Sequence, residues 1–437
     1  MVDPVADLLA FIDRSPTPYH AVAEATRRLR GAGFRELGEA DLWDLSPGDR
    51  RYVVRGEGSL VAFEVGHAPP VESGFRAIGA HTDSPNLRLK PLADLTGHGY
   101  RQLAVEPYGG VLLHTWLDRD LSLAGRVTLR EDGEPRTLLL DFERPLLRVP
   151  NLAIHLQREI RTEGLKLNAQ THSVPIVGLE DAPPLRELLA SEIESRNAGR
   201  VTPDEILAFD LMAYDVQPAI VSGARGEFVH AARLDNLASC HAAILALLGA
   251  GDPGGAEFTR LVVLYDHEEV GSRSAQGAGG PLLADSLERI VSGYKGGAPQ
   301  GLARAVARSV LVSVDMAHAV HPNYADRHEP GHHPRVGGGP VIKQNASQAY
   351  ASDAHTAGLF RDLCSAAGVE PQYFVTRSDL ACGSTIGPIS AARVGVPTVD
   401  VGNPMLSMHS CREMAGSADV EPMIRVLRGF FGGPPGG

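Results

Sequence analysis

The chain has 437 residues, a length that predicts two or three domains with a large buried core. Its composition, 43% hydrophobic and 22% charged, is that of an ordinary globular protein, and its net charge of −12 argues against a general nucleic-acid or anionic-membrane binder. The longest apolar stretch, 242–251, is too short for a membrane helix, and residues 1–18 do not resemble a secretory signal, so we expect a cytoplasmic protein.

The first ninety residues predict helices followed by strands. A helix is expected from Pro18 to Gly31, because apolar residues recur on one face between a proline start and a glycine stop. Three runs of apolar and β-branched residues then predict strands at Tyr52–Val54, Leu60–Val65 and Phe75–Gly79.

From about residue 91 the pattern changes to short strands. They are expected at Leu103–Val105, Val111–Trp116, Gly125–Leu129 and Thr137–Leu140. Asp132-Gly133 predicts a tight hairpin between the last two of these strands. A charged helical stretch follows at 184–197.

After about residue 226 strands and helices alternate again. The strand-like runs are Leu261–Tyr265, Val310–Val314, Tyr373–Thr376 and Pro397–Val401. The sequence therefore predicts an α/β domain formed by residues 1–90 and 226–437, interrupted by a mostly β insertion at 91–225.

Potential metal ligands stand where several predicted strands end or a helix begins. Ligands of open α/β sheets collect at the carboxyl ends of the strands, so we expect these segments to converge. Histidines and carboxylates without a thiolate suit Zn²⁺, Mn²⁺ or Co²⁺ in a hydrolytic site, although each residue taken alone is more often a turn residue, a cap or a solvated charge. The candidates are His81, Asp83, Asp235, Glu268, Glu269, Asp315 and His409.

Five segments resemble the aspartyl aminopeptidases of peptidase family M18. The likeness runs through nearly the whole chain in family order. It implies a metallo-aminopeptidase-like catalytic domain interrupted by a dimerisation-type insertion domain. The segments are 79–88, 266–272, 313–324, 338–343 and 408–410.

The resemblance implies a site with two divalent metal ions, most often zinc. By motif, Asp235 bridges both ions, His81 and Asp315 complete one, and Glu269 and His409 complete the other. A bridging carboxylate is suited to holding two ions that acidify a shared water.

Two further acidic residues fit supporting roles in such a site. Asp83, two residues after His81, fits an acceptor that fixes the imidazole. Glu268, next to a ligand, fits the general base that activates the metal-bridging water and passes the proton to the leaving amine.

Substrate preference needs another residue, and Lys343 is the candidate. The chain has four lysines against 37 arginines, and Lys343 is the only charged residue between Val336 and Ser352. The resemblance makes it the partner of the substrate's acidic side chain, with Tyr350 nearby; the alternative is an exposed loop lysine. His318 could stabilise the oxyanion or be a structural histidine.

The resemblance also implies self-association. Family members form a tetrahedral homododecamer built from dimers, in which a histidine of the insertion reaches a neighbouring subunit's site; His155 matches that position. The expected partners are thus peptides with N-terminal Asp or Glu and other copies of the chain, with no nucleic acid and no membrane.

The leading hypothesis is a metallo-aminopeptidase that hydrolyses N-terminal acidic residues from peptides. A metal-dependent deacylase or carboxypeptidase with the same two-ion core is the first alternative. A catalytically silent assembly or cargo protein is the second, and Glu268 beside a full ligand set argues against it, because a structural metal site needs no base.

Overall fold

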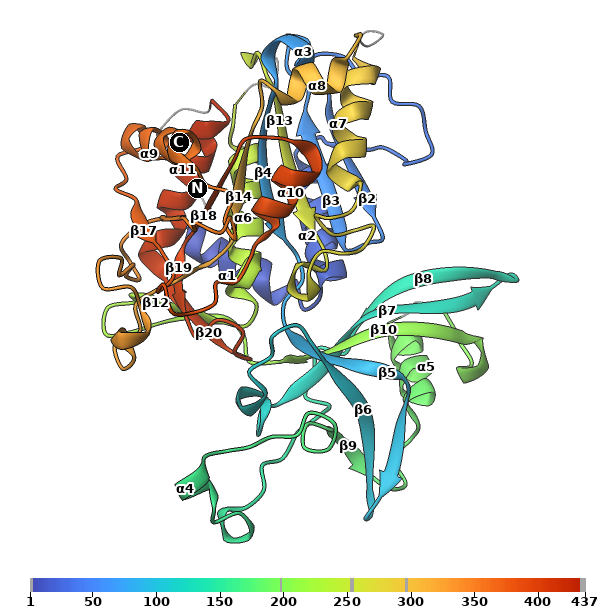
Figure 1. The fold of residues 1–437 in the computed structure, drawn as a ribbon. Coiled ribbons are helices and arrows are strands. Elements are labelled where there is room, and N and C mark those ends of the chain that lie inside the picture. Colours follow the sequence, from blue (N-terminus) through green and yellow to red (C-terminus); the bar gives the residue numbers. More distant parts are fainter. Residues whose placement is uncertain (1–2, 197–198, 252–254, 295–297, 433–437) are drawn as a thin grey trace. The chain divides into compact units, whose positions relative to one another are not determined.

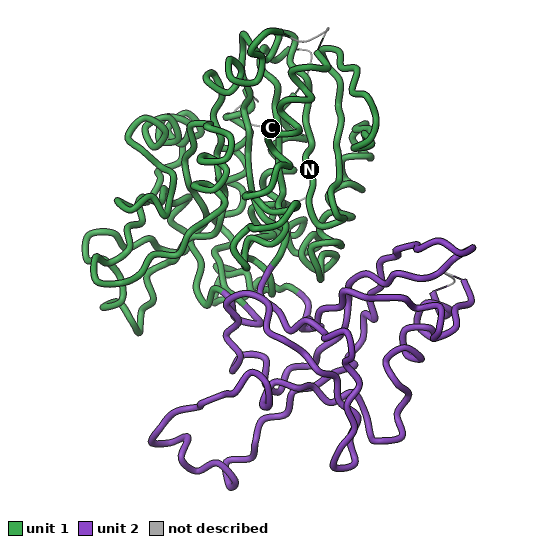
Figure 2. Tube along the Cα trace, turned by 45° about the vertical axis from the view of Figure 1, so that its right-hand side comes forward, with its two compact units in different colours: residues 1–83, 219–408, 413–437 green, residues 84–218, 409–412 purple. Residues whose placement is uncertain are grey.

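The computed structural model describes residues 3–196, 199–251, 255–294 and 298–432. The chain divides into two compact units (Figure 2). The first unit comprises Met1–Asp83, Ala219–Met408 and Glu413–Gly437, and the second comprises Ser84–Pro218 with His409–Arg412. These bounds differ by a few residues from the expected 1–90, 91–225 and 226–437. The first boundary comes earlier than expected because β5 (Asn86–Gly97) already pairs with strands of the second unit.

The first unit is built on a nine-stranded sheet. Its four middle strands are parallel to one another, and the strands on either side include antiparallel neighbours. The order across the sheet is β1 (Arg35–Glu36), β2 (Arg50–Arg55), β3 (Ser59–Glu64), β13 (Thr259–Tyr265), β4 (Phe75–His81), β14 (Val310–Val314), β18 (Thr398–Gly402), β16 (Val341–Lys343) and β17 (Gln372–Phe374).

Helices cover both faces of this sheet (Figure 1). Successive strand residues point to opposite faces, so Val262 and Leu264 enter one core and Leu261 and Val263 the other. The helices of the first core are α1 (Pro4–Asp13), α2 (Pro18–Gly31), α6 (Leu234–Leu248), α9 (Ala354–Ala366) and α11 (Val420–Phe430). Those of the second core are α3 (Pro70–Ser73), α7 (Leu282–Gly293), α8 (Gly301–Val306) and α10 (Ile386–Val394).

A smaller sheet completes the first unit. Its order is β11 (Ile220–Ser222), β12 (Phe228–Ala231), β20 (Glu413–Gly416), β19 (Pro404–Leu406) and β15 (Ala317–His318). β20 is antiparallel to both of its neighbours. This sheet matters for function, because β12 leads into α6, which carries Asp235.

The second unit is an antiparallel six-stranded sheet with few helices, as the mostly β prediction required. The Asp132-Gly133 hairpin is confirmed: both residues have positive φ, and β7 pairs with β8 on either side of them. The strand order is β8 (Glu134–Asp141), β7 (Leu121–Glu131), β10 (Ile206–Asp215), β5, β6 (Tyr100–Tyr108) and β9 (Ile176–Leu179), and the helices are α4 (Ile160–Glu163) and α5 (Leu185–Ser195).

One predicted strand of the second unit is wrong. Residues 113–116 of the expected Val111–Trp116 strand form a 3₁₀ turn, in which the Thr115 amide donates to the Leu112 carbonyl at 2.9 Å. Trp116 is the one buried residue of that turn. A β-prone run without a partner strand thus satisfies its backbone locally.

Among the helices of the described residues, none is long and apolar enough to span a membrane.

Candidate metal centre

Several predicted ligand segments meet at one edge of the nine-stranded sheet. β4 ends at His81, β13 ends shortly before Glu268 and Glu269, and Asp315 follows β14. These three strands are parallel neighbours, so their carboxyl ends lie side by side. Asp235 joins them from the first turn of α6. Five of the seven candidates therefore stand at or after strand ends on a single edge of the sheet; the five are His81, Asp83, Glu268, Glu269 and Asp315.

His81 lies at the centre of this group, and its ring is buried. Its Nδ1 is 3.0 Å from the backbone oxygen of Asp83, and its Nε2 is 3.5 Å from Asp235 Oδ1 and 3.4 Å from Asp315 Oδ1. Ligand atoms of His81, Asp235 and Asp315 all lie within 4.8 Å of one another. Although burial lowers the pKa of His81, hydrogen bonds with Asp235, Asp315 and Asp83 raise it well above its usual value, so a proton on Nε2 faces the two carboxylates where a metal ion would bind.

Asp235 reaches the group through an irregular helix start. Asp235 (φ −83°, ψ 104°) and Asn236 (φ −124°, ψ 26°) both depart from helical geometry, and the peptide bond between them is cis. Asp235 is 3% exposed. The irregular turn places its buried carboxylate beside His81.

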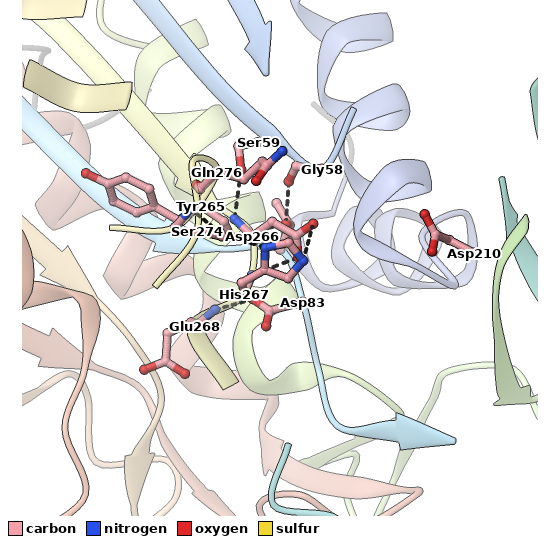
Figure 3. Close-up of polar contacts among 12 residues, drawn as sticks. Gly58, Ser59, Asp83, Asp210, Tyr265, Asp266, His267, Glu268, Ser274 and Gln276 are labelled. Carbon is pink, nitrogen blue, oxygen red and sulfur yellow. Dashed lines mark hydrogen bonds and ion pairs between the residues drawn. The ribbon is translucent and has the colours of Figure 1, made fainter. Parts of the chain in front are cut away.

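Glu268 and Glu269 lie in a 3₁₀ turn, Glu268–Val270, after β13. In a strand such neighbours would point to opposite faces, whereas here both offer a ligand atom within 4.8 Å of a ring nitrogen of His81. Asp83 holds the turn, because its carboxylate accepts the Glu268 and Glu269 amides at 3.1 Å each (Figure 3). Asp83 thus contacts His81 chiefly through its backbone oxygen and orients the two glutamates through its side chain.

The segment before and after this turn is anchored as well (Figure 3). The Asp266 amide donates to Ser59 Oγ at 2.9 Å, and Ser59 Oγ donates to the Gln276 carbonyl at 3.0 Å. His267 Nδ1 lies 2.8 Å from Ser274 Oγ. These bonds fix the loop that carries both glutamates against the start of β3.

The carboxylates of this cluster repel one another. Burial raises the pKa of Glu268 to about 8; His81 opposes the rise, and the charge of Asp315 adds to it. Burial, and next the charge of Asp235, also raise the pKa of Glu269 well above its usual value. Both shifts mean that burial and the neighbouring carboxylates together disfavour the ionised form of the two glutamates.

This donor set fits divalent metal ions. One imidazole nitrogen and four carboxylates stand within ligand distance of their neighbours, and no thiolate is among them. A cation placed there would offset both the burial and the repulsion that raise the two glutamate pKa values. Nitrogen and oxygen donors of this kind suit Zn²⁺, Mn²⁺ or Co²⁺.

Lys343 is buried at 2% exposure, so the alternative of an exposed loop lysine is wrong. Its Nζ donates to the backbone oxygens of Asp315 at 2.9 Å and Met316 at 3.3 Å, and lies 3.9 Å from Asp315 Oδ2. It also stands 5.1 Å from the ring centre of Tyr350. Lys343 and Tyr350 therefore form a pair directly beside a candidate metal ligand.

A cavity of about 310 Å³ borders Tyr350 of this pair, and Lys343 is not among its lining residues. His318, Tyr350 and Phe374 line it, together with Arg327 and Arg377. The His318 ring is 5.7 Å from that of Phe374, and Tyr350 is nearly buried. His318 thus lies on the wall of this cavity.

The two remaining candidates, His409 and His155, belong to the second unit. His409 Nδ1 lies 3.1 Å from the Gly110 carbonyl oxygen. His155 is exposed in the short turn Ile154–Leu156. Their roles stay predictions.

Three buried residues near the centre were missed by the sequence analysis. Glu413 Oε2 accepts the Asp235 amide at 3.0 Å, and Asn236 Nδ2 donates to the Val314 carbonyl at 2.8 Å. Asp400, opposite Lys343 across β16 and β18, accepts the Ala351 amide at 2.6 Å. In the sequence, Asn236 adjoins Asp235 and Glu413 follows His409 by four residues, while Asp400 is near no candidate. Such closeness in sequence does not predict the observed hydrogen bonds.

Comparisons with known proteins identify relatives of the whole chain. The sequence profile described as "Aminopeptidase I zinc metalloprotease (M18)" matches residues 11–431. The chain belongs to the M18 family of aminopeptidases. The M18 match spans both units, so the inserted sheet is part of the family's architecture.

M18 relatives from bacteria match over almost their full length. A probable M18 family aminopeptidase 2 of Ectopseudomonas mendocina (strain ymp) is 48% identical over 435 residues, covering 98% of each chain. Its counterpart in Pseudomonas aeruginosa PAO1 is 49% identical over 430 residues, covering 97% of each.

Solved structures show the same fold. The chain superposes on a structure titled as the Ape4 and Nbr1 complex with a TM-score of 0.95 and 41% identity, covering 98% of this chain and 85% of that one. The mApe1 dodecamer of S. cerevisiae gives a TM-score of 0.86 at 30% identity, with 98% and 96% covered. The predicted α/β catalytic domain with an inserted domain is confirmed.

Proposed function

We propose that this chain is a two-metal aminopeptidase that removes N-terminal Asp or Glu from peptides. The observation that carries the proposal is the buried set of His81, Asp235 and Asp315, with Glu268 and Glu269 beside it, in a chain of a zinc aminopeptidase family. The acidic preference is supported by a buried lysine next to that set, Lys343.

The proposed site holds two divalent cations, most readily Zn²⁺, with Mn²⁺ or Co²⁺ as alternatives. Asp235 is the shared ligand, His81 and Asp315 hold one ion, and Glu269 and His409 hold the other. When bound, such a pair of ions polarises the scissile carbonyl and makes water a stronger acid.

Glu268 supplies the base in this proposal. It takes a proton from the water whose oxygen forms the new bond to the carbonyl carbon, and it gives that proton to the amine nitrogen as the carbon–nitrogen bond breaks. Asp83 keeps the base in place through the two amide bonds to the glutamate turn. His318 faces the cavity and would donate to the oxygen that gains negative charge.

Recognition of the substrate falls to the side chains around the cavity. Lys343 binds the acidic side chain, and Tyr350 closes the pocket over it. His155 acts in the site of a neighbouring copy. Each role rests on the family resemblance together with the placement of the residue.

The proposal is tested with matched peptides that differ at the N-terminus. After treatment with a chelator the protein should be inactive, and Zn²⁺, Mn²⁺ or Co²⁺ should restore hydrolysis of an Asp-peptide but not of its N-acetylated form. Equal cleavage of the acetylated peptide would instead indicate the deacylase or carboxypeptidase alternative. Absence of turnover after metal is restored would indicate a silent assembly protein.

We also propose that the chain assembles into a closed homododecamer of tetrahedral symmetry, since a dodecamer is recorded for its mApe1 relative. Light scattering should then give a mass about twelve times the 46.5 kDa of the chain. Short acidic peptides should be cleaved, while folded proteins with the same N-terminus should not. A species of monomer mass that is fully active would contradict this proposal.

A further inference from the structure

Glu413 stands out among the buried residues that the proposed chemistry does not use. It is the first residue of β20, it is 2% exposed, and it faces Ala231 of β12 across the sheet. Four residues after Ala231, the chain reaches Asp235, whose amide donates to Glu413 Oε2 at 3.0 Å. A carboxylate of the smaller sheet, that of Glu413, therefore binds the backbone of Asp235, the proposed shared ligand.

The amide that Glu413 accepts needs an external partner. Amides in the first turn of a helix have no acceptor within the helix. Asp235 lies in that turn of α6 with non-helical angles, after Arg233 in the left-handed region (φ 59°, ψ 25°). An acceptor oxygen at the right distance, from a carboxylate or from a side-chain amide, can be that partner.

The next residue, Asn236, is held by a different strand, β14. Asn236 Nδ2 donates to the carbonyl oxygen of Val314 at 2.8 Å, and Val314 immediately precedes Asp315. The irregular turn is thus fixed between β20 and the end of β14. Its geometry decides where the Asp235 carboxylate stands relative to His81 and Asp315.

We infer that Glu413 is a positioning residue that orients Asp235 for metal binding by accepting its backbone amide. The inference rests on the two-ion site of the proposed function. It adds to that site Glu413, which is not one of the proposed metal ligands. Within the described part of the chain, Glu413 is in none of the groups whose atoms could hold an ion together. Groups that orient ligands typically change metal affinity by about 10–100-fold when they are replaced.

Two substitutions separate the hydrogen bond from the charge. Glu413→Gln keeps an acceptor oxygen at the same reach but removes the charge. Glu413→Asp keeps the charge but withdraws the oxygen by one methylene. If the bond to the Asp235 amide is what matters, glutamine should preserve metal binding and aspartate should weaken it.

The measurement is calorimetric titration of Zn²⁺ into the chelator-treated full chain, with melting of the metal-free protein as the check on folding. We expect Glu413→Asp to raise the zinc dissociation constant about 10–100-fold, and Glu413→Gln to stay within about threefold of the wild type. Asp419→Ala is the control: this buried carboxylate accepts the Gly337 and Gly339 amides at 2.7 and 2.8 Å, and neither residue is a proposed ligand. It should lower melting without changing zinc affinity.

Asp235→Ala gives the reference for a lost ligand. Wild-type affinity in Glu413→Asp, or a loss in Glu413→Gln as large as that in Glu413→Asp, would overturn the inference while the two-ion proposal stands. A wild-type chain that binds no zinc would overturn both.

Discussion

Glu268→Gln should lower kcat by about 10²–10⁴-fold, the usual contribution of a general base, while zinc content and KM for an Asp-peptide stay near those of the wild type. Glutamine fills the same space but cannot accept a proton from water. Because burial raises the pKa of Glu268 to about 8 in a crowded acidic cluster, replacing the carboxylate should not lower the melting temperature of the metal-free protein.

Glu269→Gln is the control for this experiment. It removes the neighbouring carboxylate, which the proposal makes a ligand, so it should reduce bound zinc as well as turnover. Steady-state kinetics combined with metal analysis distinguishes the two variants. Turnover of Glu268→Gln close to that of the wild type would show that another group is the base.

The core of the first unit could be predicted because its parallel strands are buried on both faces. Leu261–Leu264 is a continuous apolar run, which is typical of such strands, and it forms part of β13. Val310–Val314 matches β14 at both ends. Once strands of this kind are placed in parallel, polar residues at their carboxyl ends must converge, and His81 and Asp315 do so.

Other features depend on contacts between distant segments and could not be predicted. The turn at Asp235 is irregular, and its support by Glu413 joins residues 178 positions apart. Val111–Trp116 has strand-forming residues, but no strand in the described part of the chain pairs with it. Residues 113–116 form a 3₁₀ turn instead. Burial of Lys343 is also tertiary, because three carboxyl or carbonyl oxygens around its ammonium come from Asp315 and Met316.

Lys343 can therefore have one of two roles: it can bind the acidic side chain of the substrate, or it can hold Asp315 in place. An ammonium has three donors, and two of them face the backbone oxygens of Asp315 and Met316. The third could meet an acidic side chain of the substrate. Alternatively, the charge could serve only to hold Asp315, whose Oδ2 is 3.9 Å away.

Long-range attraction cannot supply the acidic preference. The chain carries a net charge of −12, and salt at ~0.15 M screens charges beyond ~8 Å. Selection of Asp or Glu must then arise at short range inside the pocket. A charge-assisted hydrogen bond contributes about 1.5–3 kcal/mol, which corresponds to roughly one to two decades in affinity or rate.

Lys343→Met should accordingly lower kcat/KM for Asp- and Glu-peptides by about 10–100-fold and leave Ala- and Leu-peptides unchanged or improved. Neutral peptides can gain, because the variant no longer places a buried ammonium opposite an apolar side chain. Zinc content should stay at the wild-type level if Asp315 keeps its position. Equal losses on acidic and neutral peptides, together with lost zinc, would mean that Lys343 supports Asp315 and that another residue recognises the acid.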